Sequence, residues 1–301
     1  MERVWGGRGF EEKLGRSLPN AKVIGEAWEI CDRDEAPSVI VGGKFDGKTL
    51  RAAIESDTAY IMGPGWNPQT RFPILVKWLD CQERLSLQVH PPMGVAEKLG
   101  GEPKTENWYV ADCSAGAGLI AGLKKGATKD AFVKSLSDNS AEELLHRFPV
   151  KKGDSLFVPS GRLHAIDGGN LILEIQQNSD TTYRVYDWGR VGLDGKPRAL
   201  HVQESIDSID FNDFEPNPIH INGKSGNLCT AAEFAIDLIK LDAGERLKIE
   251  SGKAMYIVSV AEGELVDEDS NTVALSENIV VPFAESLEFT ATKPSVVLLT
   301  K

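Results

Sequence analysis

The chain has 301 residues, of which 41% are hydrophobic, so it is long enough to bury one large core or two smaller ones. Its formal net charge is −12 and it has no run of Lys or Arg, which argues against a nucleic-acid or anionic-membrane partner. No apolar run approaches the roughly 20 residues that span a bilayer, and the four cysteines show no C-x-x-C spacing, so we expect a cytoplasmic protein with reduced thiols.

Short apolar runs separated by Gly, Pro and Asp dominate the first two thirds of the chain and predict an all-β sandwich or barrel. Helical patterns are few, and we expect them to decorate a sheet: 50–55, 129–136, 141–147 and 203–209. The third of these begins with a predicted capping box of Ser140 and Glu143. The strand-like runs lie at 38–41, 72–79, 85–90, 108–111, 118–122, 155–158, 171–176 and 183–186.

The composition changes near 211–218, where two prolines and several Asn and Asp residues suggest a linker. Strand-like runs resume after it, and the only histidine beyond this point is His220. We therefore expect two domains, a catalytic metal-binding domain over 1–210 and a smaller, metal-free β domain over 211–301. The strand-like runs of the second part lie at 234–241, 254–260, 279–282 and 295–299.

Two histidines lie in patterns typical of metal ligands. Side chains alternate along a strand, so Gln88 and His90 share one face of the predicted strand. The segment ending at His164 reads G-x5-P-x-G-x2-H, the pattern of a cupin barrel. Because zinc and similar metals prefer imidazole nitrogen and carboxylate oxygen, we expect His90 and His164 to act with Glu106, the best-placed carboxylate. Gln88 can add an amide oxygen.

Four segments, in this order along the chain, give a more specific indication of the family: 85–92, 104–109, 158–165 and 176–187. They resemble the signature segments of type I mannose-6-phosphate isomerases in their short bacterial form. The resemblance extends from Trp5 to at least Leu200, whereas the C-terminal part is only loosely similar. Residues 30–33 depart from the longer relatives, which carry a His-Pro pair there, and the large helical domain of those relatives is absent.

The resemblance implies a cupin-type jelly-roll barrel and the interconversion of mannose 6-phosphate and fructose 6-phosphate. It implies one zinc ion per chain, held by Gln88, His90, Glu106 and His164, and no organic cofactor. The expected partner is a small sugar phosphate, and we expect a monomer or a homodimer.

An aldose–ketose isomerase moves a proton between neighbouring carbons through an enediolate, which needs a cation and an acid or base. Glu174 points opposite to its apolar strand neighbours and is our candidate proton shuttle. Lys104 lies two residues before Glu106, on the same face, and can assist proton transfer or ring opening. The resemblance places an essential arginine at Arg184, for the enediolate or substrate oxygens, with Asp180 orienting its neighbours.

The resemblance also suggests Lys77 and Ser86 as phosphate ligands. Lys77 lies in the apolar run 74–79, where a buried charge requires a partner such as a phosphate.

Two alternatives remain open. A different cupin enzyme, such as an iron-dependent oxygenase, usually pairs H-x-H with a carboxylate, whereas this chain has Gln88 in the first position. A non-catalytic sugar-phosphate sensor could lose the proton-transfer set, yet Glu174, Arg184 and Lys104 are all present.

Overall fold

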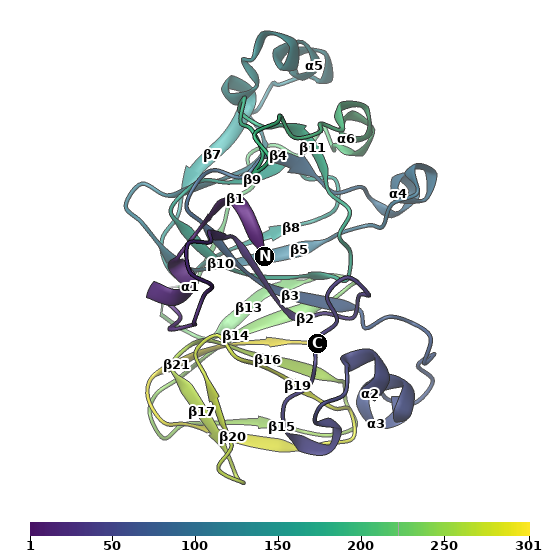
Figure 1. The fold of residues 1–301 in the computed structure, drawn as a ribbon, viewed down its shortest axis with the longest axis vertical. Helices are drawn as coiled ribbons and strands as arrows, with labels where there is room; N and C mark the ends of the chain where they lie inside the picture. Colours follow the sequence, from purple (N-terminus) through teal and green to yellow (C-terminus); the bar gives the residue numbers. More distant parts are fainter. Residues whose placement is uncertain (222) are drawn as a thin grey trace. The chain divides into compact units, whose positions relative to one another are not determined.

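The structure, a computed structural model that describes residues 1–221 and 223–301, is built mainly of antiparallel strands with short helices (Figure 1). This confirms the expected mostly-β class. The strands form four sheets, and none of them closes on itself within the described residues. None of the described helices is both long and apolar enough to cross a membrane.

The chain divides into two compact units, the first made of Met1–Ala27 and Trp78–His220 and the second of Trp28–Lys77 and Ile221–Lys301. Two strands, β2 (Glu26–Ile30) and β3 (Ile74–Cys81), have residues in both units. The functional division expected from the sequence, a metal-binding 1–210 and a metal-free 211–301, stays a prediction.

The first unit contains a six-stranded sheet in the order β12-β8-β5-β10-β3-β2 and a five-stranded sheet in the order β11-β4-β9-β6-β7. Its other elements are β1 (Glu2–Gly7), α1 (Gly9–Glu12), β4 (Leu87–Val89), α4 (Met93–Leu99), β5 (Glu106–Cys113), β6 (Gly118–Leu123), α5 (Lys129–Asp138), η2 (Ala141–Leu144), β7 (Leu145–Pro149), β8 (Asp154–Val158), β9 (His164–Ile166), β10 (Asn170–Gln177), β11 (Tyr183–Tyr186), α6 (Val202–Ser208) and β12 (Ile219–His220).

The two sheets of the first unit pack face to face. One apolar cluster joins Trp108 and Val158 of the six-stranded sheet to Leu119 and Ala121 of the five-stranded sheet. A second cluster lies on the opposite side of the five-stranded sheet, where Leu87 and its neighbours are covered by Phe132 of α5. The five-stranded sheet is therefore buried on both faces, and its inner face looks toward the other sheet.

The second unit is also a pair of packed sheets, ordered β13-β14-β21-β16-β19 and β15-β20-β17-β18, and residues such as Val258 and Phe289 share its core. Its elements are η1 (Gly43–Phe45), α2 (Leu50–Ser56), α3 (Thr58–Met62), β13 (Gly226–Thr230), β14 (Ala235–Leu241), β15 (Arg246–Ile249), β16 (Tyr256–Glu262), β17 (Glu264–Asp267), β18 (Thr272–Ala274), β19 (Asn278–Val281), β20 (Leu287–Ala291) and β21 (Ser295–Thr300).

Helices predicted near 50–55, 129–136 and 203–209 are confirmed as α2, α5 and α6, but the helix predicted over 141–147 is wrong. Only one 3₁₀ turn forms, and the chain then pairs with β6 as β7. The predicted capping box is also absent, since the Ser140 hydroxyl donates to Asp138. Leu145 and Phe148 bury their side chains from the strand, so tertiary packing outweighs the local helical signal.

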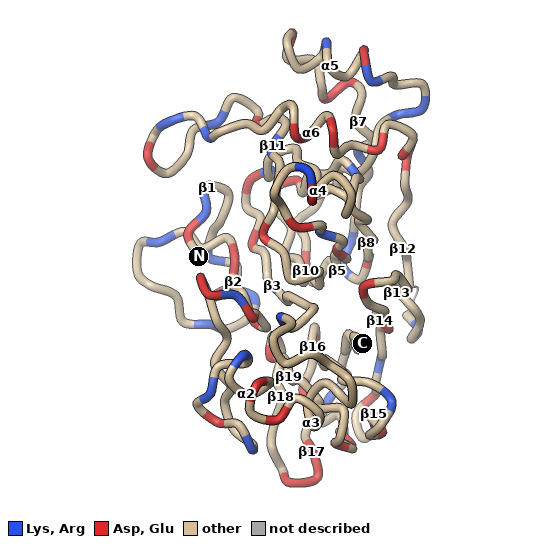
Figure 2. Tube along the Cα trace, turned by 90° about the vertical axis from the view of Figure 1, so that its right-hand side faces the viewer, with Lys and Arg blue, Asp and Glu red and all other residues tan. Residues whose placement is uncertain are grey.

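Charged residues of both signs are scattered over the described chain rather than gathered into one basic stripe (Figure 2). The distribution agrees with the absence of a Lys or Arg run in the sequence.

Candidate metal centre and its surroundings

Strand ends of the first unit bring three ligand-type side chains together. Glu106 is the first residue of β5, His164 is the first residue of β9, and His90 directly follows β4. Glu106 belongs to the six-stranded sheet, whereas β4 and β9 are neighbours in the five-stranded sheet. Because the two sheets face each other, the three side chains converge between them.

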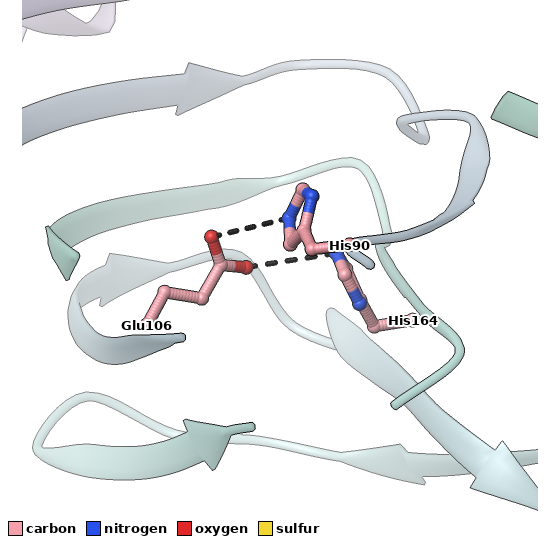
Figure 3. Close-up of side chains that lie close together, drawn as sticks. All are labelled: His90, Glu106 and His164. Atoms are coloured by element: carbon pink, nitrogen blue, oxygen red, sulfur yellow. Dashed lines mark ion pairs between the residues drawn. The ribbon is translucent and has the colours of Figure 1, made fainter. Parts of the chain in front are cut away.

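The convergence is close and fully buried. Glu106 Oε2 lies 3.4 Å from His90 Nε2, and Glu106 Oε1 lies 3.6 Å from His164 Nε2 (Figure 3). The ligand atoms of the three residues all lie within 4.8 Å of one another. The His90 and His164 rings lie 4.7 Å apart between their centroids.

Backbone carbonyls orient both imidazole rings. His90 Nδ1 lies 2.9 Å from the carbonyl oxygen of Thr181, and His164 Nδ1 lies 2.8 Å from that of Arg162. Because a carbonyl can only accept, each Nδ1 carries the proton, and each Nε2 presents a lone pair toward Glu106. Both Nε2 atoms and Glu106 Oε1 lack a hydrogen-bond partner within the described part of the chain.

These protonation states follow from the surroundings. Burial, with a contribution from nearby His90, lowers the pKa of His164 to about 3, and burial together with Lys104 also lowers the pKa of His90. Burial alone would raise the pKa of Glu106, but Lys104 and His90 hold it well below its usual range. Three buried acceptors thus meet at one point, where a divalent cation would satisfy them all.

Lys104 connects this cluster to a second buried carboxylate. Its Nζ lies 2.8 Å from Glu106 Oε2 and 3.9 Å from Glu174 Oε1. Burial alone would lower the pKa of Lys104, but the two carboxylates outweigh it and raise the pKa. The indole of Trp108 donates to Glu174 Oε2 at 2.9 Å, which fixes that carboxylate beside the lysine.

Gln88 and Arg184 lie in the same row of the five-stranded sheet as His164. Gln88 is opposite His164 on β9 and opposite Arg184 on β11, and cross-strand partners share a face. Arg184 Nη1 donates to the carbonyl of Ala199 at 2.8 Å, while its buried Nε has no hydrogen-bond partner among the described residues. The row places an amide and a guanidinium on the inner face beside the histidine.

Asp180, Ser86 and Lys77 are not part of the His-Glu-His cluster found among the described residues. Asp180 is exposed, in the turn before β11. Ser86 is buried in the first unit, whereas Lys77 is a buried residue of the second unit with its ammonium 4.6 Å from the Trp28 ring centroid. The phosphate-binding roles of Lys77 and Ser86 therefore stay predictions from the family resemblance.

The structure adds supporting groups that the sequence did not single out. Besides the two carbonyls that orient the imidazoles, Asp213 holds the side chain of Arg162 through a bidentate pair of 2.8 and 2.9 Å. Arg162 also donates to the carbonyl of Phe157 at 2.6 Å. Backbone acceptors have no sequence signature, and Asp213 is distant in the chain, so no local pattern could have found these contacts.

The fold and the cluster together define a class of protein: a mostly antiparallel, cupin-like β protein with a His-Glu-His set suited to a metal. Residues 1–148 match the family model described as the phosphomannose isomerase type I catalytic domain. The mannose-6-phosphate isomerase ManA of Bacillus subtilis is 37% identical over 270 residues, which cover 87% of this chain and 83% of that protein. The chain belongs to the type I phosphomannose isomerase family.

Other relatives differ in how much of their length is matched. The Bacillus subtilis proteins YvyI and GmuF are each 40% identical to this chain over a matched region that covers 69% of it. The same region covers only 65% of the length of each of these two relatives. The crystal structure of the mannose 6-phosphate isomerase from Bacillus subtilis superposes with a TM-score of 0.86 at 29% identity, over 100% of this chain and 96% of that one.

Proposed function

We propose that the chain is a zinc-dependent isomerase that interconverts mannose 6-phosphate and fructose 6-phosphate. The observation that carries the proposal is the meeting of three buried acceptors, from His90, Glu106 and His164, at a point flanked by Lys104 and Glu174. Family membership supports the substrate, and the donor set of imidazole and carboxylate supports zinc. Gln88, on the same face as His164, is the fourth proposed ligand.

A divalent metal held by these residues supplies Lewis-acid stabilisation of negative charge on the sugar oxygens. Lys104 complements it as a second cation: its raised pKa keeps it protonated, so it can donate a proton during ring opening but cannot serve as a base. The proton that moves between the two carbons through the enediolate needs a different acceptor.

Glu174 is our candidate for that acceptor. Its Oε2 is engaged by the indole of Trp108, and its Oε1 lies toward Lys104, so the carboxylate is fixed close to the proposed metal ligands. Arg184, in the row of Gln88 and His164, is proposed to stabilise the enediolate or bind substrate oxygens. Asp180 remains a proposed orienting residue at the exposed turn.

The test begins with the protein stripped of metal by a chelator and assayed for fructose 6-phosphate formation by a coupled reaction. Stripping should abolish turnover and added zinc should restore it, while isomerisation in heavy water should place solvent deuterium in the product. Full activity after verified metal removal would overturn the metal requirement. Substrate binding without turnover would instead indicate a sensor, and oxygen uptake would indicate an oxygenase.

The proposed phosphate ligands have a separate test. Lys77→Ala and Ser86→Ala should raise KM for mannose 6-phosphate much more than they lower kcat, because they remove binding rather than chemistry. An unchanged KM in both variants would remove the phosphate assignment while leaving the metal mechanism intact.

A further inference from the structure

A hollow of about 530 Å³ lies in the first unit, away from the candidate metal centre. Its position follows from a β-bulge in β11: Arg184 is opposite Gln88, but Tyr186 is opposite Leu87. Gln88 shares the inner face with His164, whereas Leu87 belongs to the apolar cluster beneath α5. The bulge therefore directs Tyr186 to the outer face of the five-stranded sheet, and the hollow opens there.

Two aromatic side chains and five polar or charged ones line the hollow. Tyr186 and Trp188 meet edge to face, with ring centroids 5.1 Å apart and planes at 81°. The Arg84 guanidinium lies over the indole of Trp188, 4.7 Å from its centroid. Carboxylates and an amide complete the rim, together with a second arginine: Glu83, Glu142, Asn139 and Arg190.

The lining is held in place before any ligand arrives. The indole of Trp188 donates to the carbonyl of Leu85 at 2.7 Å, and Arg84 donates to Glu142 at 2.7 Å and to Asp167. Arg190 donates to Asp187 at 2.8 Å and to the carbonyl of Arg84. A fixed lining lowers the ordering cost of binding.

Two further features distinguish the hollow from ordinary surface. Trp188 has a φ of +59°, a left-handed backbone conformation that a bulky residue rarely adopts, and such strain gathers at ligand sites. The Nε–H of Arg190 is buried and has no hydrogen-bond partner in the part of the chain that the structure describes. A buried donor without a partner is costly, which adds to the strain in this part of the lining.

The charge of the lining restricts the ligand class. Two arginines face two glutamates, and both guanidiniums are already engaged by carboxylates, so a phosphate or other anion finds no unpaired cation. A pyranose sugar fits better, because its C–H faces pack on aromatic rings while each hydroxyl both donates and accepts. The volume lies within the range of small-molecule sites and admits one or two such rings.

We propose that this hollow binds an uncharged mono- or disaccharide, at a site separate from the metal centre. Binding does not require the isomerase reaction, so the proposal stands or falls independently of the proposed function. The sugar packs on Tyr186 and Trp188, and its hydroxyls meet Asn139 and Glu142.

The test measures binding of methyl α-mannoside, mannobiose and cellobiose to the zinc-loaded protein by calorimetry and saturation-transfer NMR. At least one should bind with a Kd near the millimolar range. Saturating mannose 6-phosphate should leave that Kd unchanged. Displacement by mannose 6-phosphate would locate the sugar in the isomerase site instead, and no binding of any of the three sugars would also overturn the proposal.

Variants assign the binding to the hollow. Trp188→Ala should raise Kd at least about tenfold, because an anchoring aromatic is lost. Asn139→Gly should also weaken binding while preserving the end of α5, because Asn139 has a φ of +60°, which glycine adopts readily. Trp66→Ala, which removes a half-buried indole from the second unit, is the matched control and should leave Kd unchanged. Wild-type affinity in both Asn139→Gly and Trp188→Ala would refute the site.

Discussion

Asp213 should control metal affinity although it does not touch the metal ligands. Its carboxylate accepts two hydrogen bonds from the guanidinium of Arg162. The carbonyl oxygen of Arg162 accepts from His164 Nδ1, which keeps His164 Nε2 unprotonated and directed at Glu106. The backbone oxygen of Asp213 also accepts from Leu123 N at 3.0 Å. Replacing the carboxylate should therefore loosen the turn that carries His164.

The size of the effect follows from the exposure of the pair. The side chains of Arg162 and Asp213 are only 15% and 16% exposed. Breaking a fully buried pair costs about 3–5 kcal/mol and a surface pair less than about 1 kcal/mol, so we expect Asp213→Ala to destabilise the protein by about 3 kcal/mol. Arg162 keeps its bond to the carbonyl of Phe157, so the turn should loosen rather than unfold. Metal affinity should fall about tenfold, equivalent to about 1.4 kcal/mol.

Two measurements separate positioning from stability. Competition with a fluorescent zinc chelator gives metal affinity, and urea unfolding of the metal-free protein gives the free energy of unfolding. Asp213→Asn should lie between wild type and Asp213→Ala, because its amide oxygen can still accept. Asp32→Ala, which breaks the buried pair with Arg51 in the second unit, should cost stability but no metal affinity. If Asp213→Ala also loses stability alone, the positioning argument is refuted.

Three further outcomes are expected. Glu174→Gln, which keeps an oxygen for the Trp108 indole, should retain zinc and lower kcat about 10²–10⁴-fold; near-normal turnover would move the proton shuttle elsewhere. Because the pKa of His164 is about 3 folded and near 6.5 unfolded, the unfolded state binds more protons between these values. The metal-free protein should thus lose stability as pH falls from about 6.5 toward 3, with a shallower slope in His164→Gln, as measured by urea unfolding. Gly122→Ala should destabilise by about 3 kcal/mol in the same assay, because φ is +66° and a Cβ would meet the Asp213 carbonyl at 2.7 Å. Gly126→Ala, with a φ of +87° and open space around it, should cost less.

The ligand-type residues could be predicted because their chemistry and strand alternation are local properties. Gln88 and His90 follow a two-residue period, His164 ends a Gly- and Pro-marked segment, and Glu106 lies just before the strand-like run at 108–111. The failure at 141–147 shows the limit of the same reasoning. Its helical pattern is real, but pairing of β7 with β6 and burial of Phe148 are tertiary and override it.

The supporting residues show why the rest of the site is invisible in the sequence. Three acceptors buried together destabilise one another without a cation, and Lys104 offsets only part of that cost from one side. The protein must therefore restrain the imidazoles by other means, and it uses the backbone oxygens of Thr181 and Arg162, which any residue could supply. In a site of this kind the sequence therefore indicates the candidate metal ligands, whereas the backbone groups that hold those ligands in place are seen only in the folded structure.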